Sequence, residues 1–393
     1  MIARQKIDFH KRFVLEFVRE LFLLKLVKGK YQHKFKTRFS QFVGLRHCSL
    51  VSSGRAAFCL ILRVLNLKKH DEIILSSFNT PIVMNVIEKY GIKPVFVDSS
   101  EDNYNINPDL IEEKISSKTK AILVTHIEGY PCDMDSICSI AKKYNLQVIE
   151  DCAHAIGSRY KGRQVGTFGA TSFFSFGISK HINTVKGGAV LTNDKEINNK
   201  INKLLNNLKS ESIFSVSHKF IKYVIVSLLT NDIMYYLFVN PLIRLFRLFG
   251  FDILYYLFED KGDNHQDKIK VLSNFQSFMG LYQLNKFDFS FKKIRNNVNN
   301  YKKYLSTSVK FQTSKYHAHP SYLNFTIRLK NRDYVIKKLM SNGIDIQKTW
   351  MHSLNCLNYS KKLSNEVLYL PIHSSIIKKD IVKISTLINK FKS

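Results

Sequence analysis

Residues 147–180 read QVIEDCAHAIGSRYKGRQVGTFGATSFFSFGISK, and they decide the fold because two short β-rich runs each lead to a charged side chain. The run Gln147–Asp151 ends in a carboxylate, which is costly beside an apolar strand unless it meets a positive charge. Capping of the next helix is the alternative role for Asp151. The run Ser172–Phe176 is followed by Lys180, and desolvation there would lower the lysine pKa and free a neutral amine for attack on a carbonyl. A solvated surface lysine is the alternative.

The same alternation extends in both directions, from about residue 50 to residue 195. Further β-rich runs lie at Glu72–Ser76, Pro94–Asp98, Ala121–His126 and Ala189–Thr192, and helical runs at Gly54–Leu67, Pro81–Tyr90, Pro108–Ile115 and Met134–Tyr144. Strands separated by helices imply right-handed crossovers, so we predict an α/β fold whose mainly parallel sheet carries helices on both faces. Ligands bind beyond the carboxyl ends of such strands, where Asp98, His126 and Asp151 stand.

The segment Ser52–Arg55 precedes the first of these helices. Its small residues allow backbone N–H groups to face a phosphate at the positive end of the helix, and Ser175 could add a hydroxyl. A plain helix N-cap is the alternative for Ser53.

The order and spacing of these segments resemble the DegT/DnrJ/EryC1/StrS group, the sugar aminotransferases among the fold-type I pyridoxal-phosphate enzymes. The matching segments are 51–57 (VSSGRAA), 91–98 (GIKPVFVD), 118–122 (KTKAI), 132–137 (CDMDSI), 148–154 (VIEDCAH), 174–180 (FSFGISK), 187–192 (GGAVLT) and 370–373 (LPIH). The resemblance is strong over residues 40–200 and looser over 270–390. It implies a seven-stranded sheet in a large domain and a small α+β domain at the C-terminus.

The resemblance also implies pyridoxal 5'-phosphate as cofactor and assigns roles to residues. Lys180 would form the Schiff base with the cofactor and then move protons, and Asp151 would pair with the pyridinium nitrogen. His154 would lie beside the phenolate oxygen of the ring. The phosphate would be held by Ser53, Gly54, Arg55 and Ser175. Asn79 and Thr80 stand where the family has a Thr–aromatic pair against the ring, so Thr80 is expected at the cofactor, with Phe78 nearby.

The implied activity is transfer of an amino group, from glutamate, to a keto-sugar that is carried by a nucleotide and used for a surface polysaccharide or glycoconjugate. His126 and His181 are predicted substrate contacts. Members that replace the lysine with histidine are sugar dehydratases, so Lys180 followed by His181 favours aminotransfer. An amino-acid acceptor is one alternative; a non-catalytic relative that binds an anionic membrane or nucleic acid is another, although no nucleic-acid-binding motif is present.

The resemblance further implies a homodimer with the active site at the subunit interface. In the family an Asn of the partner subunit contacts the cofactor phosphate. That position falls on Ile269 here, and Asn264 or Lys268 could substitute for it.

Residues 200–265 break the α/β pattern with the apolar runs Ile221–Leu229, Ile233–Ile243 and Leu245–Phe258. None offers the roughly 20 uncharged residues that would span a bilayer. Residues 210–260 are therefore expected either to lie in a membrane surface or to form a buried helical subdomain or dimer contact. The segment Phe13–Val27 is expected to be a helix that packs on a partner or on the main domain; contact with a membrane is the alternative.

The chain of 393 residues carries a formal net charge of +29, which favours anionic partners. Its six cysteines form no C-x-x-C pair and read as reduced, mostly buried thiols. We expect no signal peptide, no metal site, and a location in the cytoplasm or on the inner face of the membrane. The expected division is an N-terminal helical segment (1–45), a large cofactor-binding domain (46–200), an apolar helical insertion (201–268), and a connecting helix with the small domain (269–393). In this last part we expect a helix over Ser273–Tyr304, a strand at Tyr322–Leu329, a helix at Asp333–Asn342, then a loop, and a helix at Lys378–Phe391.

Overall fold

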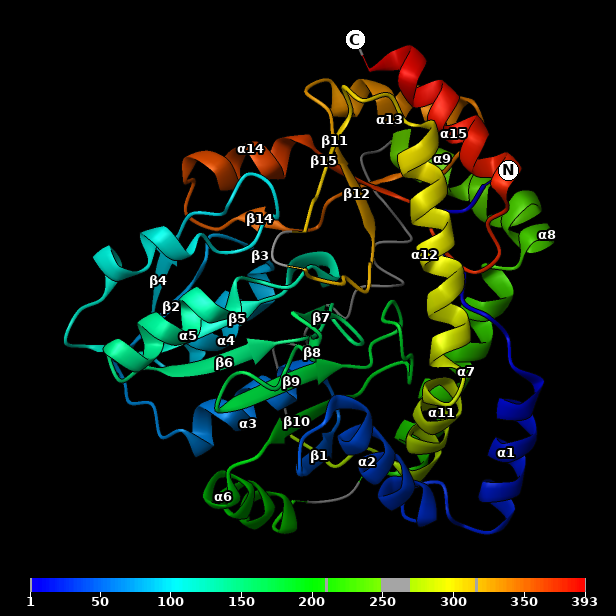
Figure 1. Ribbon diagram of the computed structural model, residues 1–393. Helices are drawn as coiled ribbons and strands as arrows, with labels where there is room; N and C mark the ends of the chain where they lie inside the picture. The colour runs from blue at the N-terminus through cyan, green and yellow to red at the C-terminus, as the bar shows by residue number, and fades with distance from the viewer. Residues whose placement is uncertain (1, 209–210, 249–268, 315–316, 393) are drawn as a thin grey trace.

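The computed structural model describes residues 2–208, 211–248, 269–314 and 317–392 (Figure 1). A seven-stranded sheet forms the centre, in the order β1-β10-β9-β6-β5-β2-β4. Five neighbouring strands are parallel: β4 (Lys93–Val97), β2 (Glu72–Ser76), β5 (Thr119–Thr125), β6 (Gln147–Asp151) and β9 (Thr171–Ser175). Strand β10 (Gly188–Thr192) runs antiparallel between β9 and β1 (His47–Val51). The predicted α/β class and mainly parallel sheet are confirmed.

Helices bury both faces of this sheet. On β2, Ile74 joins one apolar cluster while Ile73 and Leu75 join the other, because successive side chains of a strand point to opposite faces. The first cluster includes side chains of α2 (Lys30–Val43) and α5 (Met134–Lys143). The second includes those of α3 (Gly54–Val64), α4 (Pro81–Lys89) and α6 (Lys195–Asn206).

A second sheet lies in the C-terminal part, in the order β11-β12-β15-β13. Its strands are β11 (Lys310–Phe311), β12 (Phe325–Arg328), β15 (Val367–Leu370) and β13 (Gln347–Lys348), and all its pairs are antiparallel. Two helices, α13 (Arg332–Ser341) and α15 (Lys378–Phe391), pack with it in one apolar cluster. The long helix α12 (Phe287–Tyr304) runs from the large sheet to this smaller one (Figure 1).

The two parts are joined by contacts as well as by α12. Strand β14 (His352–Ser353) pairs with β3 (Phe78–Asn79), which follows β2. Near the start of the chain, Ile2 bridges Ile344, and Arg4 forms an ion pair with Asp345 at 2.7 Å. The first residues therefore pack on the C-terminal part before α1 (Lys11–Phe22) turns toward α11 (Asn274–Leu284).

Three expected elements differ in detail. The helix expected at Pro108–Ile115 is two 3-10 turns, Pro108–Leu110 and Glu112–Lys114. The predicted continuous helix over 273–304 ends at Leu284 and restarts at Phe287 as α12. The stretch expected to be a loop between residues 342 and 378 contains four elements. Strands β13 and β15 pair and complete the smaller sheet, β14 pairs with β3, and α14 (Asn358–Glu366) lies between β14 and β15.

Three short elements lie near the ends of the main strands. A 3-10 turn spans Ile127–Gly129 after β5, and a small hairpin pairs β7 (Arg159–Tyr160) with β8 (Arg163–Gln164).

The six cysteines are free thiols, and four of them are buried.

The apolar stretch after α6 is helical where the structure describes it. It contains α7 (Ile213–Leu229), α8 (Asp232–Met234), a π-helical turn (Tyr235–Val239) and α9 (Asn240–Leu248). One side of α7 packs with α1 and α11, and Phe17 of α1 stacks on Phe220 with 4.0 Å between ring centroids. Among the described residues no single helix is long and apolar enough to cross a membrane; only the pair Ile213–Leu229 and Asp232–Ile243, bent by 68°, meets that length and composition together.

Candidate active site

A cavity of about 500 Å³ lies at the carboxyl edge of the large sheet. Strands β5, β6 and β9 end at this edge, β10 begins there, and α3 starts three residues after β1. This convergence brings together side chains that are distant in sequence. The cavity is lined by every residue predicted to hold the cofactor: Ser53, Gly54, Arg55, Thr80, Asp151, His154, Ser175 and Lys180.

Asp151, the last residue of β6, is 4 % exposed. Its carboxylate accepts a hydrogen bond from the Ala153 N–H at 2.9 Å and a longer one from the Thr125 hydroxyl at 3.4 Å. Burial raises the pKa of the Asp151 carboxyl, which the Ala153 N–H and the charge of Lys180 only partly oppose. A cation against Asp151 in the cavity would therefore be strongly stabilised.

Lys180 lies four residues beyond Phe176, where the loop Gly177–Ser179 returns the chain to the cavity. Burial lowers the pKa of the Lys180 amine to about 8, although the carboxylates of Glu128 and Asp151 oppose this. A lysine of this kind is partly neutral near pH 7.5 and can act as a nucleophile and as a base.

His154 follows Asp151 by three residues and is buried at the cavity wall. Burial and the charge of Lys180 lower the pKa of the His154 imidazole well below its usual range. Its Nδ1 atom is buried without a hydrogen-bond partner among the described residues. An unpaired buried nitrogen that faces a cavity fits a polar atom of a bound molecule.

The first turn of α3 forms a narrow cradle against β9 and β10. The Ser53 hydroxyl accepts from the Ala56 N–H at 3.0 Å and caps the helix, so the capping role considered for Ser53 is present. A Cβ atom at Gly54 would lie 2.9 Å from Cβ of Ser175, and one at Gly188 would lie 2.5 Å from the Ser53 carbonyl oxygen. Only glycine allows this approach, which leaves the N–H groups at the start of α3 directed toward the cavity, where an anion is favoured.

Two polar residues that were not predicted to contact Asp151, Asn79 and Thr125, support its carboxylate. The Asn79 amide donates to the Thr125 hydroxyl at 3.0 Å, and that hydroxyl donates to Asp151. Both residues line the cavity. Thr80 uses its hydroxyl to cap α4, accepting from the Ile82 N–H at 3.4 Å.

Glu128 is a third missed residue. It is 1 % exposed and accepts from the Tyr369 hydroxyl at 2.6 Å and from the Asn324 amide at 2.7 Å. Its backbone is left-handed with φ of 52°, an uncommon conformation for a residue with a side chain. The sequence signal was only a carboxylate three residues after β5, which cannot reveal its proximity to Lys180.

His126 is not among the residues that line the cavity, so the structure does not support its predicted contact with the substrate. The His126 side chain is fully buried and its Nε2 lies 3.2 Å from Glu150. Its Nδ1 accepts from the Cys132 N–H at 3.1 Å, so Nε2 carries the proton and donates to Glu150. The strand end turns His126 away because β5 finishes at Thr125, and Thr125 instead faces Asp151.

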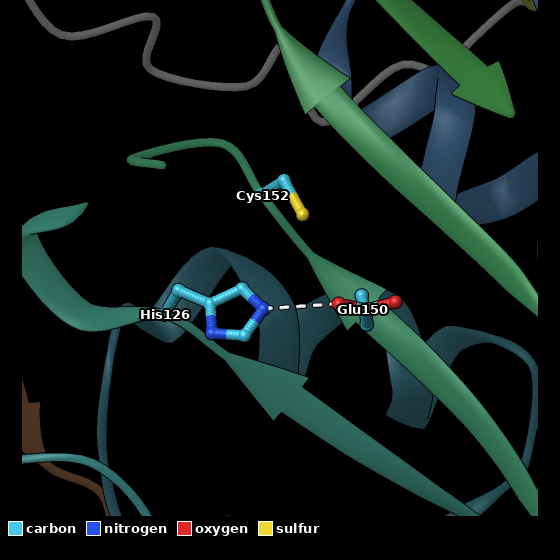
Figure 2. Close-up of side chains that lie close together, drawn as sticks. All are labelled: His126, Glu150 and Cys152. Atoms are coloured by element: carbon cyan, nitrogen blue, oxygen red, sulfur yellow. Dashed lines mark hydrogen bonds and ion pairs between the residues drawn. The ribbon is translucent and has the colours of Figure 1, made fainter. Parts of the chain in front are cut away.

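Ligand atoms of His126, Glu150 and Cys152 lie within 4.8 Å of one another, a spacing compatible with a metal ion (Figure 2). However, Glu150 also accepts from three backbone N–H groups, those of Gly166, Phe168 and Gly169, at 2.6–2.7 Å. Its oxygens are thus already satisfied. We interpret the cluster as a structural network that fixes the loop between β8 and β9.

His181 faces a second, smaller cavity of about 210 Å³ that Lys180 also borders. Burial lowers the pKa of His181 to about 4, and its Nε2 has no hydrogen-bond partner among the described residues. Its contact with a substrate stays a prediction.

Aromatic side chains reach the main cavity from unexpected positions. Phe78 packs edge-on against Tyr104 and does not line it. The aromatic side chains that do line it are those of Phe58, Phe173 and Trp350. Trp350, which precedes β14, comes from the C-terminal part of the chain, so sequence order could not place it.

One face of α7 also lines the cavity, through Ser215, His218, Lys219 and Lys222. The spacing of these residues places them on one side of a helix. Ile269, where the family carries its partner-supplied Asn, is instead buried in a core cluster, and Asn264 and Lys268 lie outside the described residues.

These residues fit pyridoxal 5'-phosphate. Buried Asp151 suits a protonated ring nitrogen, the unpaired Nδ1 of His154 suits a ring oxygen, and the Gly54 cradle suits a phosphate. Because its pKa is lowered, the Lys180 amine is partly neutral and can attack the cofactor's aldehyde.

Comparison with known proteins agrees with this geometry. A model of the DegT/DnrJ/EryC1/StrS aminotransferase family matches residues 13–219 and 243–389. GDP-perosamine synthase of Escherichia coli O157:H7 is 44% identical over 170 residues, which are 43% of this chain and 47% of the relative. The dTDP-3-amino-3,6-dideoxy-alpha-D-galactopyranose transaminase of Aneurinibacillus thermoaerophilus is 42% identical over 184 residues, which are 46% of this chain and 51% of the relative. The matched part spans about half the length of these curated relatives.

Solved structures share the fold along nearly the whole chain. The aminotransferase TlmJ from Streptoalloteichus hindustanus superposes with a TM-score of 0.78 at 20% identity, covering 99% of this chain and 98% of that one. The putative sugar aminotransferase Spr1654 from Streptococcus pneumoniae, in its PMP-form, gives 0.78 at 20% identity, covering 99% and 100%.

Proposed function

Because this chain belongs to the DegT/DnrJ/EryC1/StrS aminotransferase family, we propose that it transfers an amino group from glutamate to a nucleotide-linked keto-sugar. The observation that carries the proposal is the convergence of Lys180, Asp151 and the Gly54 cradle on one cavity. Relatives named for GDP- and dTDP-linked amino sugars support the acceptor class. A relative named for spore coat polysaccharide biosynthesis supports use of the product in a surface polysaccharide.

Pyridoxal phosphate, when bound, supplies a protonated ring that stabilises the negative charge formed on carbon during amino transfer. Residues of this chain bind the cofactor and control its protonation. Asp151 keeps a proton on the ring nitrogen, and the Asn79–Thr125 pair holds the Asp151 carboxylate in place. The N–H groups of α3 and the Ser175 hydroxyl bind the phosphate.

Lys180 acts as general base and general acid at the carbon that gains or loses the amine. A pKa of about 8 lets it both accept and return a proton near neutral pH. His154 orients the ring through its unpaired Nδ1. The presence of lysine at this position favours amino transfer over dehydration.

The proposal predicts transfer of labelled nitrogen. The protein, loaded with pyridoxal phosphate, would be incubated with ¹⁵N-glutamate and a panel of GDP-, dTDP- and UDP-linked keto-sugars. Mass spectrometry should detect a ¹⁵N-amino sugar with at least one acceptor, and Lys180→Ala should give none. Amine transfer only to keto acids would identify an amino-acid aminotransferase instead.

The enzyme is also proposed to work as a homodimer with the cavity at the subunit boundary, as the family resemblance implies. Sedimentation of the loaded protein should give twice the mass of 45.7 kDa. A monomer with full activity would contradict a shared active site.

A further part of the proposal is peripheral contact with an anionic membrane through residues 210–260. Of the large apolar side chains exposed in the described ranges, thirteen lie between Ile213 and Phe246 and seven between Phe9 and Leu24. These segments are neighbours, since α1 packs on α7, and α1, α7 and α8 follow one side of the molecule (Figure 1). The net charge of +29 favours anionic lipid over a second, equally charged copy as the occupant.

Vesicle flotation tests this contact. The triple variant Ile221→Gln, Ile225→Gln, Leu228→Gln changes only exposed positions of α7. The wild-type protein should float with phosphatidylglycerol vesicles and the variant should not. Unchanged flotation together with a lost dimer would show that this surface joins two copies.

A further inference from the structure

Helix α7 presents a basic face to the cavity, and the proposed aminotransferase function alone does not require it. Ser215, His218, Lys219 and Lys222 recur at intervals of three or four residues, so they share one side of the helix, and all four line the cavity. The exposed apolar side chains of α7 lie on the neighbouring face, about a quarter turn away at roughly 100° per residue. The polar side of α7 therefore borders the cavity, and the apolar side next to it is exposed.

Positive charge exceeds what one cofactor phosphate requires. Five lysine or arginine side chains line the cavity: those of Arg55, Lys180, Lys186, Lys219 and Lys222. Among the lining residues in the described ranges, Asp151 is the one carboxylate, at the end where the cofactor ring would lie. The start of α3 and the Ser175 hydroxyl already provide a phosphate cradle.

One of the two α7 lysines, Lys219, is held in place by hydrogen bonds and an ion pair. Nζ of Lys219 contacts the Glu211 carboxylate at 2.5 Å and the Gln276 side-chain oxygen at 3.3 Å. The amide of Gln276 donates to the carbonyl oxygens of Thr184, at 3.0 Å, and of Lys186. This network ties α7 to the segment just before β10, which borders the cavity.

Besides its partner Glu211, Lys219 has further cations near it. Burial lowers the pKa of Lys219; Glu211 opposes the shift, while the charges of Lys186 and Lys270 lower the pKa further. Such crowding of like charges is favourable once an anion lies between them.

We propose that the basic face of α7, centred on Lys222 and His218 with Lys219 and Lys186 behind them, binds the diphosphate of the sugar acceptor. This inference rests on the proposed function, because the subsite lies in the same cavity as the cofactor residues. The family match omits residues 220–242, so Lys222 comes from a segment outside the matched part. The diphosphate could be carried by a nucleoside or by a polyprenyl lipid, and both present the same anion to α7.

The test is calorimetric titration of the pyridoxal-phosphate-loaded protein with inorganic pyrophosphate, GDP, dTDP and farnesyl diphosphate. Lys222→Met removes the charge and retains the aliphatic part of the side chain. Lys203→Met on α6, an exposed position that does not line the cavity, is the matched control. We expect Lys222→Met to weaken diphosphate binding about tenfold or more, and the control to bind like the wild type. Binding of a nucleoside diphosphate but not farnesyl diphosphate would identify a nucleotide carrier, and the reverse would identify a lipid carrier.

Three results would overturn the subsite. One is equal diphosphate affinity in Lys222→Met and Lys203→Met, and another is no binding of any diphosphate by the wild type at millimolar concentration. The third is loss of bound cofactor, measured by absorbance after alkaline denaturation, in Lys222→Met alone, because α7 would then hold the cofactor phosphate. Failure of the proposed function would show separately, as a wild-type protein that does not respond to any amino donor.

Discussion

The lowered pKa of Lys180 makes a quantitative prediction about how the apoenzyme takes up its cofactor. Only the neutral amine attacks the cofactor's aldehyde, so the rate of uptake follows the neutral fraction of Lys180. With a pKa of about 8, roughly 24% of the amine is neutral at pH 7.5, against about 0.1% for the usual 10.5. The structure therefore predicts uptake on the order of 100-fold faster than a solvated lysine would allow.

Stopped-flow absorbance of the apoprotein mixed with pyridoxal phosphate, from pH 6 to 9.5, measures this rate. It should rise about tenfold per pH unit below pH 7 and level off above pH 8, as a group with a lowered pKa requires. The same reaction with Nα-acetyl-lysine corrects for titration of the cofactor itself, and Lys180→Ala shows the background. A corrected rate that still climbs tenfold per unit at pH 9.5 would refute the reasoning, because burial would not have shifted the amine.

Three further predictions follow from individual contacts. Asp151→Asn removes a carboxylate that raises the Lys180 pKa, so the pH midpoint of cofactor uptake should fall below that of the wild type. Equilibrium dialysis should also show cofactor affinity at least about 100-fold weaker. An unchanged affinity would contradict the pairing of Asp151 with the ring nitrogen. Gly54→Ala would place a Cβ 2.9 Å from Cβ of Ser175, so it should weaken cofactor binding about tenfold or more in the same assay. If the variant bound the cofactor as tightly as the wild type, the start of α3 would not be the phosphate cradle. His126→Ala would remove one of four donors to Glu150 and leave the Cys132 N–H without its acceptor, so urea unfolding should show a loss of about 2 kcal/mol with cofactor binding retained. Lost cofactor binding at normal stability would place His126 at the cofactor after all.

Much of the site could be predicted from the sequence because its residues stand at the ends of strands. Asp151 and Ser175 close β6 and β9, and parallel neighbours end at the same edge of a sheet. Gly54 and Arg55 begin the helix that follows β1. Strand β1 runs in the same direction as β9, because both are antiparallel to β10, so its carboxyl end lies at the same edge. Local pattern and motif order were enough for these positions.

His126 shows where this reasoning fails. It too follows a strand closely, but β5 ends one residue earlier, and a shift of one residue turns a side chain to the opposite face. Thr125 consequently faces Asp151, and His126 faces Glu150.

The remaining site residues depend on long-range contacts that no local pattern contains. Trp350 reaches the cavity because β14 pairs with β3 across 273 residues of chain, from His352 to Asn79. Glu128 comes close to Lys180 only through the turn after β5. The basic face of α7 could not be recognised from the sequence, because Lys222 interrupts the apolar run Ile221–Leu229 without indicating that it borders a cavity.

The central claim is that Lys180 serves an aminotransferase, and the half-reaction with an amino donor tests it most directly. The protein loaded with pyridoxal phosphate would be mixed with glutamate, and with glutamine, aspartate and alanine in parallel, without any acceptor. We predict that one donor abolishes the visible band of the bound cofactor and releases about one keto acid per chain, and that Lys180→Ala does neither. A loaded wild-type protein whose band survives every donor, with no keto acid released, would contradict the account.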